Sequence, residues 1–180
     1  MSLSVPNLND FIERIFLILS NSTLLFPQSV GGDESATDLV NQIIPYALPV
    51  PEQPIEGPGP PHIFIKEADS AFSRFNQIGR SSINVQGPEE AFLELYVVVV
   101  ARGASYQDSQ VQLFNIIQAV KQVLKSNMRL GDPTTNPPLQ NTLCNLLETI
   151  TVPWLIDSEE KTVIARNIIV RPKVFINLLS

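Results

Sequence analysis

The chain has 180 residues, a length that suits a single domain with its own core, and its 18 acidic against 12 basic side chains give a net charge of -6. The negative balance argues against a protein whose main task is to grip nucleic acid. A single cysteine, Cys144, excludes an internal disulfide framework and favours an intracellular place of synthesis, and neither a membrane span nor a signal peptide is predicted.

The first predicted element is an amphipathic helix over residues 8–20, LNDFIERIFLILS. Asn7 can cap this helix, and Asp10 and Glu13 favour the positive end of its dipole. Its apolar residues recur at helical spacing on one face: Phe11, Ile12, Ile15, Phe16 and Leu19. Residues 21–38 are rich in turn formers, and a short apolar patch follows at 39–44.

A proline-dense stretch, PYALPVPEQPIEGPGPP, occupies residues 45–61. Each proline removes a backbone N–H and fixes φ, so neither a helix nor a central strand can run through the stretch. We predict an extended, semi-rigid arm at the surface of one domain that spans residues 1–180.

The predicted core lies between residues 62 and 125. HIFIKEA (62–68) alternates like a strand, and a second strand is possible over 82–86. Residues 92–102 predict a strand with one fully buried face, on the odd positions, and a second face covered at its centre by a helix. That helix is expected over 108–125 and to end before Gly131 and Pro133. We expect five residues of these two elements to be buried together: Leu95, Val97, Val99, Ile117 and Val120.

The C-terminal third is expected to hold a short helix, a hairpin and an apolar terminus. Asn136-Pro137-Pro138 can start a short helix that bears Leu139, Leu143, Leu146 and Leu147. The runs 151–156 and 162–170, across a charged turn at 157–161, predict the hairpin. After Pro172, KVFINLLS can dock on the chain itself or on a neighbour. Together these elements predict an α+β fold, with a small, mostly antiparallel sheet packed by an N-terminal helix and a central amphipathic helix.

One segment, LELYVVVVARGASYQDSQ (93–110), has the strand–glycine–helix layout of phosphate-binding turns. A phosphate loop needs several glycines and usually a lysine, whereas only Gly103 is present and no Gly-Lys-Ser/Thr follows. We therefore predict a strand-to-helix turn that builds the core.

Candidate catalytic and metal-binding residues are few. His62, the only histidine, stands at the start of a strand, and Cys144 lies among leucines, where a buried inert thiol is usual. No Cys/His cluster offers zinc spacing. Solvated surface charge is the expected role of the paired carboxylates: Glu67 with Asp69, Glu89 with Glu90, and Asp157 with Glu159 and Glu160. The sequence predicts no catalytic, cofactor or metal site, and favours a protein that functions by being assembled rather than an enzyme.

The order of these elements resembles that of the tail terminator (tail completion) proteins of long-tailed phages and related particles. The resemblance covers most of the chain and is carried by the segments LNDFIERIFLIL (8–19), HIFIKEADSAFSRF (62–75), FLELYVVVVARG (92–103), QVQLFNIIQAVKQVL (110–124) and TVIARNIIV (162–170). It implies a virion protein, assembled in the host cytoplasm, that forms a hexameric ring on the head-proximal end of the tail tube. Its partners would be further copies of itself, the tail tube protein and the head–tail connector or another neck protein, with no membrane. DNA would pass through the lumen without specific binding, because negative walls repel phosphates.

Interfaces are expected in segments that a lone domain has little reason to keep. The candidates lie in the arm, in the loop after residue 67 and in the terminus: Pro49, Pro51 and Pro54; Arg74 and Arg80; Phe175, Ile176, Leu178 and Leu179. Two alternatives stay open. One is another neck or tail structural protein, such as a head–tail connector or a tube-like subunit. The other is a small enzyme or ligand-binding domain whose site is assembled from scattered residues.

Overall fold

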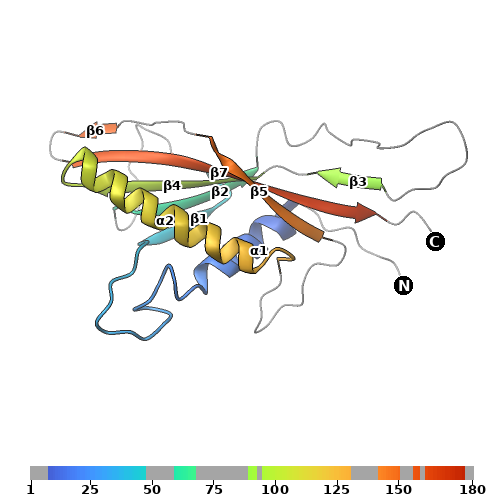
Figure 1. Cartoon of the computed structure of the whole chain (residues 1–180), viewed down its shortest axis with the longest axis horizontal. Helices are drawn as coiled ribbons and strands as arrows, with labels where there is room; N and C mark the ends of the chain where they lie inside the picture. The colour runs from blue at the N-terminus through green and yellow to red at the C-terminus, as the bar shows by residue number, and fades with distance from the viewer. Residues whose placement is uncertain are drawn as a thin grey trace, which may run out of the picture.

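The computed structural model describes residues 8–47, 59–67, 89–92, 95–130, 142–150, 156–158 and 161–176. These residues form two helices and one mixed sheet (Figure 1). In chain order the elements are α1 (Leu8–Ser20), β1 (Gln42–Pro45), β2 (His62–Glu67), β3 (Glu89–Phe92), β4 (Leu95–Gly103), α2 (Tyr106–Ser126), β5 (Thr142–Ile150), β6 (Ile156–Ser158) and β7 (Lys161–Ile176). The predicted α+β class is confirmed. Most of the proline-rich arm, the possible strand at 82–86 and Leu139 lie outside the described residues.

The sheet is built around β7. Its strands follow the order β1-β2-β4-β7, and β3, β5 and β6 also pair with β7. Only β1 and β2 are parallel; the other described pairings are antiparallel. β4 and β3 share one register on the same edge of β7, since Leu95 pairs with Val170 and Phe92 with Lys173. The predicted strand over 92–102 therefore belongs to a single ladder, with Phe92 in β3 and the remainder beginning at Leu95.

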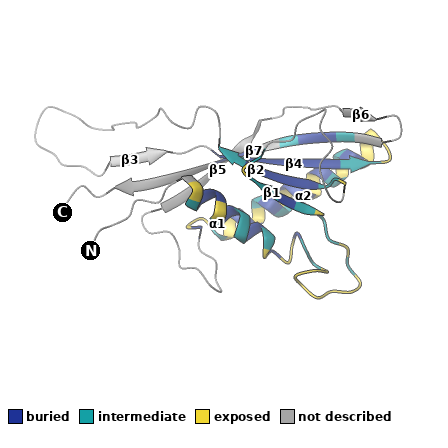
Figure 2. Ribbon diagram, turned by 180° about the vertical axis from the view of Figure 1, so that it is seen from behind, coloured by how far each residue is buried: buried dark blue, intermediate teal, exposed yellow. Residues whose placement is uncertain are grey.

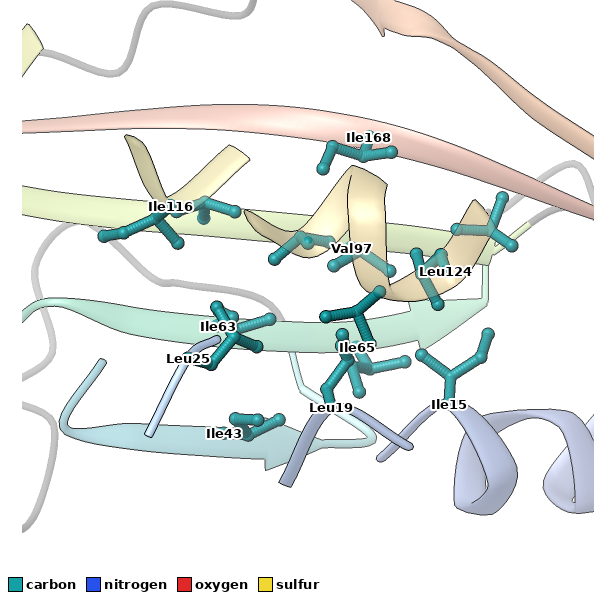
Figure 3. Packing of buried hydrophobic residues seen from close by; sticks show 14 of the residues in the cluster. Ile15, Leu19, Leu25, Ile43, Ile63, Ile65, Val97, Ile116, Leu124 and Ile168 are labelled. Atoms are coloured by element: carbon teal, nitrogen blue, oxygen red, sulfur yellow. The ribbon is translucent and has the colours of Figure 1, made fainter. Parts of the chain in front are cut away.

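Both helices pack on the face of the sheet that carries the odd-numbered residues of β4. Ile15 and Leu19 of α1 and Leu124 of α2 are directed at Ile65 and Val97 (Figure 3). The five residues expected to be buried together are all in this cluster, and none exceeds 3% exposure. Burial of apolar surface, at about 25 cal/mol per Å², is the main stabilising contribution of this layer.

The prediction that a helix covers the even-numbered face of β4 is wrong. Phe64, Val98, Val100 and Ala165 form a separate cluster on that face, and no residue of the described helices belongs to it. α2 leaves β4 through a short turn, and its buried stripe packs on the odd face because that face is apolar along its whole length. In the part of the chain that the structure describes, neither helix is long and apolar enough to cross a membrane.

The prediction of a short helix after Pro138 is wrong for residues 142–150, which form β5. Leu143, Leu146 and Leu147 fit a helical spacing, but Thr142–Leu147 pair residue by residue with β7 in an antiparallel ladder. Strand preference depends on such neighbours more than on the segment itself, so a partner far along the chain overrides the local pattern. Cys144 consequently lies on a strand, opposite Pro172.

β7 is longer than the predicted closing strand at 162–170. It runs for 16 residues and passes through Pro172. On the β5 edge Pro172 lies opposite Cys144, within the antiparallel ladder. Figure 1 shows β7 continuing past the helices together with β3 and β5.

The hairpin between β6 and β7 is confirmed, with a shorter turn than predicted. Asp157 pairs with Thr162 and Ser158 with Lys161, so three residues assigned to the turn belong to the strands. α2 ends at Ser126, one residue after the predicted end at 125 and before Gly131, as expected. Asn127 closes it by donating its backbone N–H to Leu124 O at 3.1 Å and its side-chain Nδ2 to Val123 O at 2.8 Å.

Candidate functional site

The turn from β4 into α2 is closed by its own side chains. Ser105 Oγ accepts from the Asp108 N–H at 3.1 Å and donates to Asp108 Oδ2 at 2.7 Å. The Ser109 hydroxyl donates to Ser105 O at 3.0 Å. A carboxylate thus stands where a phosphate-binding turn would hold an anion, and like charges repel. This geometry supports the interpretation as a strand-to-helix turn.

Gly103 allows the close approach of β4 and α2 at this turn. A Cβ at this position would lie 2.5 Å from Ser109 N and 2.8 Å from Asp108 Cβ. Both separations are shorter than a van der Waals contact, and the Ser109 N belongs to the backbone, which cannot move aside without displacing the helix. The glycine therefore serves strand–helix packing.

His62 and Cys144 are far apart and cannot form a catalytic pair. His62 is fully buried on β2, where its ring meets Phe64 edge-on at 6.2 Å between centroids. His62 pairs with Val100 of β4, and Val100 pairs with Ala165 of β7. Cys144 instead pairs with Pro172 of β7. Seven positions along β7 and three strand spacings across the sheet separate the two backbones by roughly 25 Å.

The predicted carboxylate groups that begin at Glu67 and Glu89 lie on distant parts of the sheet. Glu67 of β2 is level with Val170 of β7, and Glu89 of β3 is paired with Ile176, which is about 20 Å further along the strand. Asp157 lies on β6, and Asp69, Glu159 and Glu160 lie outside the described residues. Among the side chains that the structure describes, no group of three His, Cys, Asp or Glu could hold a metal ion.

Of the predicted interface residues, only two lie in described elements. Phe175 and Ile176 belong to β7, and their backbones pair with Glu90 and Glu89 of β3. The chain after Pro172 therefore docks on its own sheet as far as Ile176. The remaining candidates lie outside the described residues: Pro49, Pro51, Pro54, Arg74, Arg80, Leu178 and Leu179.

The loop between α1 and β1, residues 21–41, is held in one shape by Asp38. Asp38 Oδ1 accepts from the N–H groups of Gln28 and Ser29 at 2.9 and 3.1 Å, and Oδ2 accepts from the Ser29 hydroxyl. The bond from the Ser29 hydroxyl is the main reason that the pKa of Asp38 lies below its usual value. A similar bond from Ser35 lowers the pKa of Asp33. The α1–β1 loop is thus an ordered, ionised surface.

The outer face of α2 is a second surface, and the sequence reasoning missed it. Tyr106, Val111 and Phe114 are 53%, 56% and 57% exposed although they are large and apolar. Exposed and buried residues alternate around this helix (Figure 2). The available signal was the position of Val111 and Phe114, which fall opposite the buried stripe of the helix.

The exposed part of this face is uncharged over four turns. Its residues recur every three or four positions and form what we call the α2 stripe: Gln107, Val111, Phe114, Gln118 and Gln122. Asp108 flanks the stripe near its start, and Lys121 and Lys125 flank it near its end. Aromatic and aliphatic side chains among uncharged amides are typical of the centre of a protein–protein interface.

No protein-family model and no curated protein matches this sequence.

Proposed function

We propose that this chain is a structural virion protein, a tail terminator that assembles into a hexameric ring. The ring caps the tail tube and joins it to the head connector. The observation that carries the proposal is the order and arrangement of the elements. An N-terminal helix, a long ordered loop, antiparallel strands, a central amphipathic helix and a closing hairpin follow one another, and both helices share one face of the sheet.

The exposed apolar side chains of α2 support a protein that associates with other subunits. Single exposed apolar residues are ordinary, but Tyr106, Val111 and Phe114 lie within three turns of one helix and each is more than half exposed. A ring subunit needs such a surface on its sides.

The charge of the chain supports a lumen through which DNA slides. The net charge is -6, and residues 8–47 alone carry five acidic side chains against one arginine, Arg14. Negative walls repel the phosphates of the genome and prevent it from sticking during passage. We expect the purified protein to leave duplex DNA unshifted on a native gel at physiological salt.

The test is the mass and shape of the full chain in solution. Native mass spectrometry should give about 119 kDa, six times the 19.9 kDa of one chain, and negative-stain microscopy should show rings with a central hole. Added to polymerising tube subunits of the same particle, the rings should stop tube elongation. A chain that remains at 19.9 kDa at high concentration, or tubes that elongate unchanged, would contradict the proposal.

A further inference from the structure

The α2 stripe is suited to contact between copies of this chain. Each copy carries a net charge of -6, so two copies repel unless at least one of the two contact surfaces lacks excess negative charge. The stripe provides such a surface. Between residues 106 and 130 the only acidic side chain is Asp108, against three basic ones, Lys121, Lys125 and Arg129.

The α1–β1 loop carries the complementary charge. Residues 21–41 contain Asp33, Glu34 and Asp38 and no basic residue. Leu24 and Val30 add apolar surface, each 42% exposed. Because Asp38 already fixes the loop, docking it costs less conformational entropy than docking a flexible segment.

We propose that the α2 stripe of one copy binds the α1–β1 loop of a second copy. The inference rests on the proposed ring and names its subunit contact. Val111 and Phe114 remain more than half exposed, so a copy's own loop does not cover its own stripe. Two different surfaces of the same chain make a head-to-tail contact, which closes into a ring when the rotation between subunits permits.

The experiment uses two full-length variants, each with one surface blocked. Val111→Glu with Phe114→Glu blocks the stripe. Val30→Lys with Glu34→Lys blocks the loop and leaves the hydrogen bonds of Asp33 and Asp38 in place. All four positions are exposed, so the circular dichroism spectrum should match that of the wild type and each variant should melt in one sharp transition. The control, Asn9→Asp, adds a negative charge at an exposed position of α1.

The two blocked variants should each be monomeric at concentrations where the wild type and the control form rings, with association weakened about tenfold or more. Mixed one to one, they should form a dimer and nothing larger, because only one intact stripe and one intact loop remain per pair.

Three results would overturn the inference. Rings formed by the stripe-blocked variant would leave the proposed function standing and place the contact elsewhere. Monomers that do not pair on mixing would exclude the head-to-tail contact between these two surfaces. A wild-type chain that stays monomeric would overturn both the contact and the ring.

Discussion

Ser105 and Asp108 bind each other twice at the start of α2. The serine oxygen accepts from the aspartate N–H at 3.1 Å, and its hydroxyl donates to Asp108 Oδ2 at 2.7 Å. Ser105 has extended backbone angles, φ -137° and ψ 167°, which mark it as the capping residue. This pair places the first helical residue at Tyr106, two positions before the predicted start at residue 108.

Replacing Ser105 by alanine should lower the free energy of unfolding by about 1 kcal/mol, because an N–H of the first turn loses its acceptor. Urea denaturation followed by circular dichroism measures the change. Ser105→Thr keeps a hydroxyl and should retain most of the stability. If threonine destabilises the chain as much as alanine does, the hydrogen bond is not the cause.

Gly103→Ala should destabilise the chain by about 1–3 kcal/mol, since the added methyl group would overlap the backbone of Ser109. Gly59→Ala is the matched control. Its Cβ would meet only the Nη1 end of the Arg102 side chain, at 3.1 Å, and that end can move. Equal melting temperatures for the two variants would show that α2 can separate from β4 at little cost.

The elements predicted well from the sequence are those specified by their own periodicity. α1 was predicted with its observed bounds, because five apolar residues mark one helical face between a polar start and a turn. The buried stripe of α2 and the odd face of β4 follow from the same kind of pattern, and they meet in one core. Each of these segments carries its information locally.

The elements predicted wrongly owe their structure to strand pairing with β7. The spacing of Leu143, Leu146 and Leu147 is compatible with a helix, and only pairing with residues about 25 positions later makes the segment a strand. A proline usually ends a strand, but β7 continues through Pro172, which lies opposite Cys144 of β5. The α2 stripe was missed because apolar residues outside the periodic face were not weighed as a surface of their own.

Val97→Asp should abolish cooperative folding. Val97 is fully buried between the sheet and α2, and an unpaired buried carboxylate costs several kcal/mol against a total stability of about 5–15 kcal/mol. Val111→Asp is the matched control, because the same substitution at a position that is 56% exposed should leave a sharp melting transition. A soluble Val97→Asp variant that melts cooperatively would contradict the placement of β4 in the core.

Removing the Asp38 carboxylate should reduce stability in a pH-dependent way. Its folded-state pKa lies below the ordinary 3.8, chiefly because of the Ser29 hydroxyl bond, so the stabilisation is complete above that value and is lost as pH falls through the folded pKa. The stability difference between wild type and Asp38→Ala should therefore be constant from neutral pH to about 5 and shrink below 3.8. Ser29→Ala should reproduce part of the difference. A difference that stays constant down to pH 2 would exclude the carboxylate's charge as its source.

The proline-rich arm must be tested by replacement, because the parallel pairing of β1 and β2 needs a connection. Pro45 pairs with Ile65, so the chain must return from there to His62 at the other end of the ladder. Asn41 fixes that return, since its Nδ2 donates to Gly59 O at 2.6 Å and its backbone N–H donates to Pro61 O at 2.9 Å. Deleting residues 47–59 would remove the first of these bonds and leave too short a crossover, which normally takes a dozen or more residues.

Replacing residues 48–58 by glycine and serine at equal length keeps the connection and removes the prolines. The monomer should stay folded, with an unchanged circular dichroism spectrum. Ring formation or head–tail joining should weaken, because a flexible arm loses more conformational entropy when it docks. Native mass spectrometry and an assay of joined particles measure the two effects. A control that keeps Pro49, Pro51, Pro54 and Pro58 and changes the other residues of 48–58 to serine separates stiffness from side-chain contacts. If the glycine–serine arm assembles and joins like the wild type, the arm only connects β1 with β2 and takes no part in assembly.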